Sequence, residues 1–166
     1  MTGVQTCALP IYTTVDSTGD VGQYTSINCG VTTDCQIVYY DVTNTALKFL
    51  RCLDGTDAGD DPCNDAAERT ITTLDGASGC PTGCSTTADV GQYTATYCPT
   101  ATDCKISYYD VTNGDLKFRD CDAAGCSTGT STTVNWTVPE FIGFLIPFAP
   151  FLPKIVKKLK IKNLKF

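Results

Sequence analysis

The feature that most constrains this chain is an internal repeat that aligns without a gap. Residues 20–52 read DVGQYTSINCGVTTDCQIVYYDVTNTALKFLRC, and residues 89–121 read DVGQYTATYCPTATDCKISYYDVTNGDLKFRDC. The offset is 69 residues (89 − 20), and 21 of the 33 aligned positions are identical. Self-similarity at such a spacing predicts a repeat architecture.

A shorter echo lies beside each unit. It reads TTVD at residues 13–16, TTLD at residues 72–75 and TTVN at residues 132–135, so the copies begin 59 (72 − 13) and 60 (132 − 72) residues apart. We interpret the echo as the last strand of a unit. The first copy would then be the last strand of a preceding unit, and the chain is expected to be the end of a longer array.

Each unit is predicted to contain four short strands. The strand segments are rich in β-branched and aromatic residues and are bounded by turn residues. Thr43-Asn44 begins a turn, and Asn113-Gly114 in the second unit is the strongest two-residue hairpin signal. In the first unit the expected strands are residues 22–29, 36–41, 47–51 and 69–74.

These patterns predict an all-β fold made of antiparallel four-stranded units that resemble β-propeller blades. Two units are an incomplete array, since a closed propeller needs about four to eight blades. The body shows no helical period, and we expect two similar sheets within residues 20–75 and 89–135. The predicted organisation is the end of a preceding repeat plus repeat 1 (residues 12–75), a linker (76–88), repeat 2 (89–137) and a C-terminal tail (138–166), which we expect to be helical.

The composition excludes several classes of function. The 166 residues include no histidine, which removes the commonest general base and the commonest metal ligand. Residues 1–138 carry 17 acidic and 6 basic side chains, a charge of −11, whereas residues 139–166 carry 6 lysines and Glu140, a charge of +5. An acidic body repels phosphates, so no nucleic-acid partner is expected. No catalytic constellation is visible, and we do not expect this fragment to be an enzyme.

Eleven cysteines indicate an oxidising, extracellular location. With Cys7 set aside, ten remain as sequence neighbours, and we expect them to form structural disulfides. A zinc site at Cys80 and Cys84 is the alternative, but it lacks histidines and a second half. A redox pair would need the C-x-x-C spacing. The expected pairs are Cys29–Cys35, Cys52–Cys63, Cys80–Cys84, Cys98–Cys104 and Cys121–Cys126.

The densest cluster of oxygen ligands follows the third strand of the first unit. Asp54, Asp57, Asp60 and Asp61 form a candidate calcium loop, because calcium takes six to eight oxygen ligands in a flexible loop. The spacing does not match the D-x-[DN]-x-[DN]-G pattern. A solvated acidic turn closed by Cys52 and Cys63 is the interpretation we favour, and no other cofactor is expected.

Each unit also carries a Tyr-Tyr-Asp motif, at residues 39–41 and 108–110. A tyrosine nucleophile with an acidic neighbour is one interpretation. Recurrence in both units favours a structural role, in which one tyrosine of each pair faces the core or the next sheet and Asp41 or Asp110 caps the turn. The exposed tyrosines remain candidates for a surface that stacks on glycans.

The intact motifs VGQYT, YYDVTN and LKF resemble the bacterial extracellular repeats that are usually described as sialidase-like β-propeller blades. The resemblance covers residues 13 to 135 and implies a cell-surface protein that acts in adhesion, in glycan or protein binding, or as a coat. The chain lacks the S-x-D-x-G-x-T-W box of sialidases, and its three arginines are scattered. The alternative is the C-terminal part of a secreted hydrolase whose active site lies in further N-terminal blades.

The tail changes composition abruptly. From residue 141 to residue 153 every residue is apolar, glycine or proline, and lysines follow. This order resembles the PEF-type C-terminal sorting signals of prokaryotic surface proteins, with Val138, Pro139, Glu140 and Phe141 as the motif. A permanent anchor and a monotopic amphipathic tail are the alternatives. All three imply a membrane partner and a surface location.

Residues 1–11, MTGVQTCALPI, are interpreted as an artefact. The library adapter ACT-GGA-GTT-CAG-ACG-TGT-GCT-CTT-CCG-ATC, translated in frame, gives Thr2 to Ile11. A remnant secretory signal is the alternative, but the segment lacks a basic start and a long apolar stretch. We leave these residues out of the fold prediction and expect the natural protein to extend further toward its N-terminus.

Overall fold

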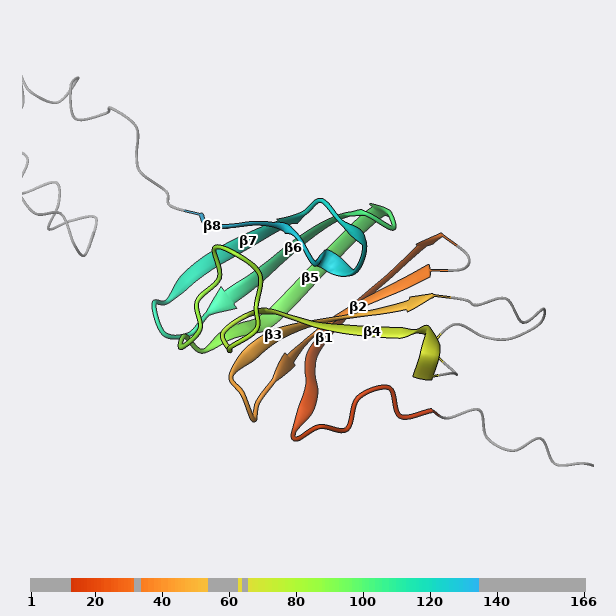
Figure 1. Ribbon diagram of the computed structural model, residues 1–166. Coiled ribbons are helices and arrows are strands. Elements are labelled where there is room, and N and C mark those ends of the chain that lie inside the picture. The colour runs from red at the N-terminus through yellow and green to blue at the C-terminus, as the bar shows by residue number, and fades with distance from the viewer. Residues whose placement is uncertain (1–12, 32–33, 54–62, 64–65, 135–166) are drawn as a thin grey trace, which may run out of the picture. The chain divides into compact units, whose positions relative to one another are not determined.

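The computed structural model describes residues 13–31, 34–53, 63 and 66–134, and these residues form an all-β structure (Figure 1). Sheet A contains β1 (Val21–Val31), β2 (Asp34–Asp41), β3 (Ala46–Leu53) and β4 (Arg69–Asp75). Sheet B contains β5 (Val90–Thr100), β6 (Asp103–Asp110), β7 (Asp115–Cys121) and β8 (Gly129–Thr133). Both sheets are antiparallel, with the strands side by side in chain order.

The strands pair in the same register within each of the two sheets. Tyr39 lies opposite Lys48 in sheet A, and Tyr108 lies opposite Lys117 in sheet B. The predicted all-β fold with two similar four-stranded units is therefore confirmed for the described residues, although most strands of sheet A run one or two residues beyond their predicted ends. The expectation of a body without any helix was wrong in two places. Three-residue helical turns, η1 (Ala66–Glu68) and η2 (Ala124–Cys126), precede the last strands of the two sheets.

The turn between the second and third strands is organised by the aspartate of the Tyr-Tyr-Asp motif. The Asn44 backbone N–H and side-chain amide donate to the two Asp41 carboxylate oxygens at 3.0 and 2.9 Å. Asn113 makes the same two bonds to Asp110, both at 2.9 Å. The predicted turn-capping role of both aspartates is confirmed.

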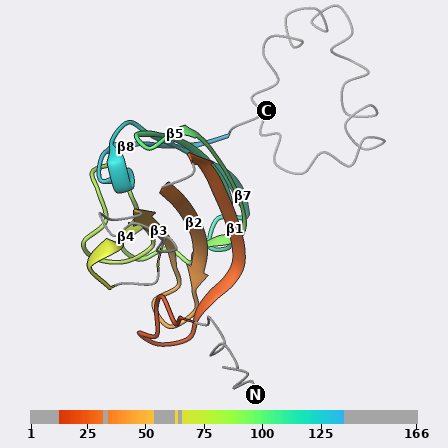
Figure 2. The same cartoon turned by 90° about the vertical axis from the view of Figure 1, so that its right-hand side faces the viewer.

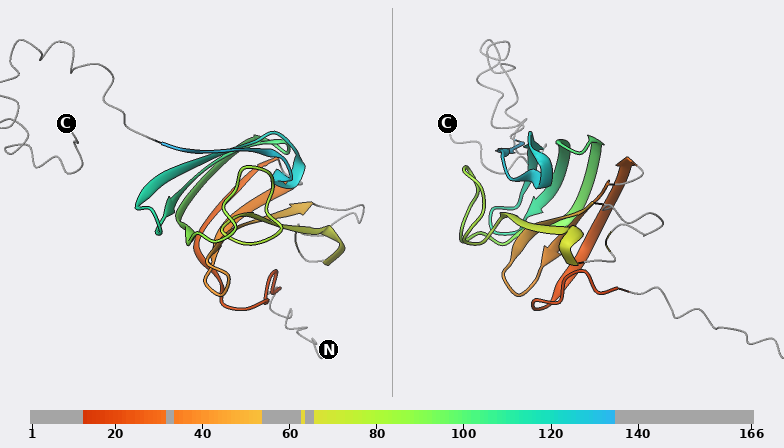
Figure 3. Two further views of the ribbon diagram at one scale, coloured as in Figure 1. Left: turned by 60° about the vertical axis from the view of Figure 1, so that its left-hand side comes forward. Right: turned by 45° about the vertical axis from the view of Figure 1, so that its right-hand side comes forward.

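The main core lies between the two sheets, which pack face to face (Figure 3). It receives side chains from one face of sheet A, from the linker and from the facing side of sheet B. Its members are Val38, Leu47, Phe49, Leu74, Ala88, Val90, Cys98, Cys104, Ile106, Tyr108, Cys121 and Cys126. A smaller cluster of Tyr39, Leu50 and Cys52 lies on the other face of sheet A.

Strand β1 lies beside β5, so that the sheets also meet along their first strands (Figure 2). The contact uses side chains. The Thr96 N–H donates to Ser26 Oγ at 3.0 Å, and the Cys98 N–H donates to Asn28 Oδ1 at 3.2 Å. These bonds satisfy backbone donors on the edge of sheet B, where an unpaired N–H would otherwise face solvent.

Asp75, the last residue of β4, is the polar centre of the interface between the sheets. Its fully buried carboxylate accepts hydrogen bonds from the Tyr108 hydroxyl at 2.7 Å and from Lys117 Nζ. It also accepts from the Ser85 N–H in the linker at 2.6 Å. A buried carboxylate needs this many partners, because leaving a buried charge unpaired costs several kcal/mol. Asp75 therefore ties both sheets and the linker together.

Candidate functional site

A row of four tyrosines crosses from sheet A to sheet B. Tyr40 lies 6.1 Å from Tyr24, Tyr24 lies 4.6 Å from Tyr93, and Tyr93 lies 6.3 Å from Tyr109, measured between ring centroids. Successive rings are tilted by 50 to 58°. Such offset, tilted contacts are the favourable geometry between aromatic rings. We call Tyr40, Tyr24, Tyr93 and Tyr109 the tyrosine row.

The middle of the row is open to solvent. Tyr24 is 38% exposed and Tyr93 is 67% exposed, whereas Tyr40 is buried and Tyr109 half-buried. Tyr97, also on β5, is 63% exposed. It lies opposite Lys105, and Lys105 shares its face of β6 with Tyr109, so Tyr97 and the Tyr109 end of the row lie on one face of sheet B.

The backbone that presents Tyr24 and Tyr93 is strained in the same way in both units. Tyr24 has φ = 51° and Tyr93 has φ = 54°, values that bulky side chains rarely adopt. Each residue lies at a register irregularity between the first and second strands. Strain of this kind costs on the order of 1–3 kcal/mol per residue and tends to occur at functional sites. The strained conformation is present twice, once per unit.

The polar ends of the row are held by neighbouring groups. The Tyr40 hydroxyl donates to Asp89 Oδ1 at 2.7 Å, and burial together with this carboxylate raises the pKa of Tyr40 to about 12. The neighbouring Tyr93 hydroxyl raises the pKa of Tyr24. Both phenols are therefore neutral at physiological pH and can both donate and accept hydrogen bonds.

The tyrosines exposed in the structure differ from those expected. The sequence pattern drew attention to the Tyr-Tyr-Asp motifs, but Tyr39, Tyr40 and Tyr108 are buried, because β2 and β6 are central strands. The expectation that one tyrosine of each pair faces the core or the next sheet is confirmed in the second unit, where Tyr108 is buried against sheet A and Tyr109 is half-buried. In the first unit both Tyr39 and Tyr40 are buried. The exposed rings belong to the VGQYT motif and to Tyr97, a residue to which the sequence analysis gave no role.

The structure places the ten predicted cysteines in five pairs at disulfide distance, with the expected partners. Cys29–Cys35 and Cys98–Cys104 join the first two strands of their sheets. In the second pair of each unit, Cys52 and Cys121 lie in the third strand, whereas Cys63 and Cys126 lie in the connection before the fourth strand. The fourth strand of the first unit begins at Arg69, as predicted.

Other predicted site residues lie outside the described residues: the acidic cluster of Asp54, Asp57, Asp60 and Asp61, and the motif Val138, Pro139, Glu140 and Phe141. Within the described part of the chain, no three side chains of metal-binding type gather in one place. The helical turns described there are too short to cross a membrane.

Asp75 and Lys117 were missed by the sequence analysis. Their signal was present, since aspartate ends two of the three short echoes and lysine recurs in LKF of both units. The echo recurs every 59 or 60 residues and the main repeat every 69 residues, so the sequence pattern does not show that Asp75 and Lys117 meet. Only packing of the last strand of one sheet against the next sheet brings them together.

Comparisons with known proteins add no relative: no family model, no curated protein and no solved structure matches this chain.

Proposed function

We propose that this chain is part of an extracellular, surface-attached repeat protein that binds glycans through the tyrosine row. The five cysteine pairs support an oxidising location. The resemblance of the tail to a sorting signal supports attachment at a membrane surface. The side-by-side contact of β1 with β5 supports a relation of the two sheets like that of neighbouring propeller blades.

The observation that carries the glycan proposal is the exposed Tyr24–Tyr93 pair on strained backbone in both units. Aromatic faces are electron-rich, and they attract the slightly positive C–H groups on the flat face of a sugar ring. Tyrosine adds a hydroxyl that can bond to the sugar's own hydroxyl groups. Tyrosine also loses little conformational entropy on binding, because it has few rotatable bonds.

The charge of the chain narrows the class of glycan. Residues 1–138 carry a charge of −11 (6 − 17), so an anionic sugar such as a sialylated or sulfated glycan would be repelled. The tyrosine row itself contains no cation to offset that repulsion. We therefore expect neutral oligosaccharides as ligands.

A glycan array probed with the fluorescently labelled full chain tests the proposal. Neutral glycans should bind more strongly than sialylated or sulfated ones, and Tyr93→Ala should lower the affinity at least about fivefold, since one stacking contact with an aromatic side chain contributes about 1–3 kcal/mol. Ile27→Ala is the matched control, because Ile27 is an exposed apolar residue of β1 outside the row. Binding that Tyr93→Ala leaves intact, or no binding to any glycan, would contradict the proposal.

A further inference from the structure

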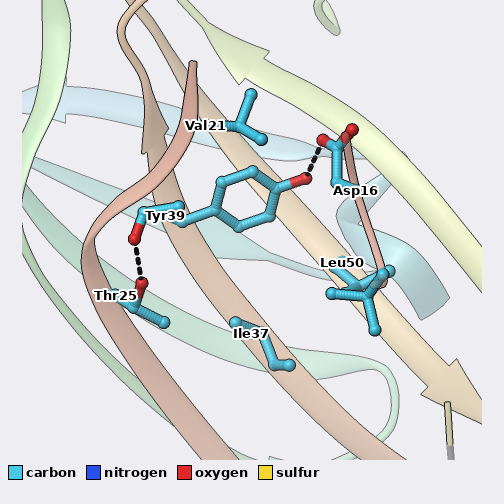
Figure 4. Close-up of a pocket in the computed structure, with 8 residues that line it drawn as sticks. Asp16, Val21, Thr25, Ile37, Tyr39 and Leu50 are labelled. Carbon is cyan, nitrogen blue, oxygen red and sulfur yellow. Dashed lines mark hydrogen bonds between the residues drawn. The ribbon is translucent and has the colours of Figure 1, made fainter. Parts of the chain in front are cut away.

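The face of sheet A that points away from sheet B contains a hollow of about 200 Å³ (Figure 4). Val21, Ile37, Leu50 and the Tyr39 ring line it, together with Asp16 and Thr25. We call this surface the open face. Val21 and Ile37 are only half-buried there, so the face has apolar side chains that lack full cover.

Asp16 forms the polar centre of the open face. Its carboxylate accepts a hydrogen bond from the Tyr39 hydroxyl at 2.6 Å and one from Lys48 Nζ at 3.2 Å. Lys48 also pairs with Asp41 at 3.1 Å. Burial acts against the charged form of Asp16, but hydrogen bonds from Tyr39, the Thr18 N–H and Lys48 outweigh it and lower the pKa of Asp16.

The same arrangement occurs where sheet A covers sheet B. There Asp75 accepts from Tyr108 and Lys117, which are the counterparts of Tyr39 and Lys48 at the 69-residue offset. Asp75 ends the last strand of the covering sheet, and Asp16 ends the first copy of the same four-residue echo. Asp16 therefore occupies the place where the last strand of a covering sheet would end.

The apolar residues of the two faces also correspond. Val90 and Ile106 are fully buried under sheet A, whereas their counterparts Val21 and Ile37 are not. A Cβ built on Gly91 would lie 2.8 Å from the Cα atom of Leu47 in sheet A, so sheet A presses directly on this glycine. A Cβ on its counterpart Gly22 would meet nothing within 4 Å. The space above Gly22 matches the position that Leu47 fills above Gly91.

From this correspondence we propose that the open face docks a further four-stranded unit of the same repeat, whose last strand ends in residues 13–16. Its first strand should lie beside β1 as β1 lies beside β5. It should carry hydrogen-bonding side chains such as Ser26 and Asn28, directed at the N–H groups of Ile27 and Cys29, the counterparts of Thr96 and Cys98.

A second copy of this chain fits the open face less well. Sheet B of the second copy would have to approach, and there Ala95 and Tyr97 stand in place of Ser26 and Asn28. Ala95 has no side-chain acceptor, and the Tyr97 hydroxyl lies at the far end of the ring, so neither places an oxygen where Ser26 Oγ and Asn28 Oδ1 accept the edge N–H groups. Ser107 replaces the core residue Val38 on the same side. In addition, Val15 and Asp16 of the chain itself already occupy the position of the last strand.

An extended chain tests the docking proposal. A copy of residues 20–75 replaces residues 1–16, so that the copied Asp75 takes the place of Asp16. Hydrogen exchange at the amides of Ile27 and Cys29 should slow at least tenfold relative to the original chain. The matched control carries Ser26→Ala and Asn28→Tyr in the added copy only, which gives it the residues of the second unit. This control should lose the extra protection of those two amides while both chains stay folded.

A second measurement covers the case in which the extension does not fold. In the original chain, Ile106→Ser should lower the melting temperature by about 5 °C more than Ile37→Ser, because only Ile106 is covered by another sheet. In a folded extended chain, Ile37→Ser and Ile106→Ser should lower the melting temperature by the same amount. Equal costs in the original chain, or unchanged exchange at Ile27 and Cys29 in a folded extended chain, would overturn the proposal. So would protection of those amides in the original chain that grows with protein concentration, since that would identify a second copy as the occupant.

Discussion

Strands β2 and β6 share most of their sequence but differ in how they are buried. In β2 the residues Val38, Tyr39, Tyr40 and Asp41 are all buried, whereas β6 alternates between buried and half-buried positions. Sheet A has sheet B on one side and the 13–16 segment on the other, but within the described residues sheet B is covered on one side only. The comparison shows that neighbouring sheets, more than the local sequence, decide which residues of a unit become core.

Equivalent positions of the two units follow the same rule. Leu47 is fully buried, whereas the identical residue Leu116 is 50% exposed. Val38, in the core, corresponds to Ser107 on the uncovered side of sheet B. Val38, Ser26 and Asn28, which contact sheet B, are among the positions at which the two units differ.

Arg119 is the exception to this rule. It replaces Leu50, yet it is fully buried on the covered side of sheet B. Its Nε donates to Cys126 Sγ at 3.4 Å and its Nη1 to Ser131 Oγ at 2.9 Å, while Nη2 has no hydrogen-bond partner among the described residues. Burial lowers the pKa of this guanidinium.

The largest effect is expected at the polar centre between the sheets. Asp75→Asn removes the charge that partners Lys117 and should destabilise the chain by about 3–5 kcal/mol, the usual cost of breaking a buried ion pair. Asp16→Asn, at the open face, should cost clearly less. Urea denaturation of the two variants measures the difference. A cost for Asp16→Asn equal to that of Asp75→Asn would show that the covering sheet adds nothing to this centre.

The next effect separates two equivalent disulfides. Removing either Cys29–Cys35 or Cys98–Cys104 by paired alanine substitutions should cost about 2 kcal/mol, because both close a loop of the same short length. The second pair should cost more, since Cys98 and Cys104 are core residues whereas Cys29 is exposed. Thermal unfolding of the two double variants provides the test, and equal losses would contradict the role of burial.

Arg119 and Leu50 occupy equivalent positions, and exchanging each for the other residue should change stability in opposite directions. Arg119→Leu gives sheet B the residue of sheet A and should stabilise the chain by about 1–2 kcal/mol, because a buried charge with incomplete partners is replaced by an apolar side chain. Leu50→Arg should destabilise it. A loss of stability in Arg119→Leu, measured by urea denaturation, would mean that the buried arginine is needed.

A smaller gain is expected in the turn after the Tyr-Tyr-Asp motif. Thr45 adopts φ = 52° where the second unit has Gly114 at φ = 74°. A β-branched residue is strained in this region, so Thr45→Gly should stabilise the chain by up to about 1 kcal/mol. Gly114→Thr is the reciprocal control and should lose a similar amount in calorimetry. A stabilising Gly114→Thr would refute this account of the turn.

The last comparison concerns the titration of the two buried tyrosines Tyr39 and Tyr108. Burial, followed by the hydrogen bond to Asp16, raises the pKa of Tyr39; burial, followed by the charge of Asp75, raises the pKa of Tyr108. Because the folded state favours the neutral phenol, this contribution is complete below about pH 10, the ordinary tyrosine pKa, and is lost as pH rises further. Absorbance titration should show that Tyr39→Phe and Tyr108→Phe each remove one late-titrating phenol. Early titration of either group would contradict the buried placement.

The sequence by itself determined the units and much of their internal structure. The repeat, the β-branched strand segments and the turn signal around Asp41 and Asp110 predicted two four-stranded sheets, because strand pairing within a unit depends on local alternation and short turns. Close cysteine spacing predicted the five pairs for a similar reason, since short connections leave few other partners within reach.

Only the tertiary structure decided which residues of the two units contact each other. Tyr24 and Tyr93 meet at 4.6 Å because β1 and β5 lie side by side, and Asp75 reaches Lys117 because one sheet covers the next. These contacts join residues 69 and 42 positions apart (93 − 24 and 117 − 75). No local pattern specifies them, because they depend on how two completed sheets pack, and the free energy of that packing comes from the whole buried surface.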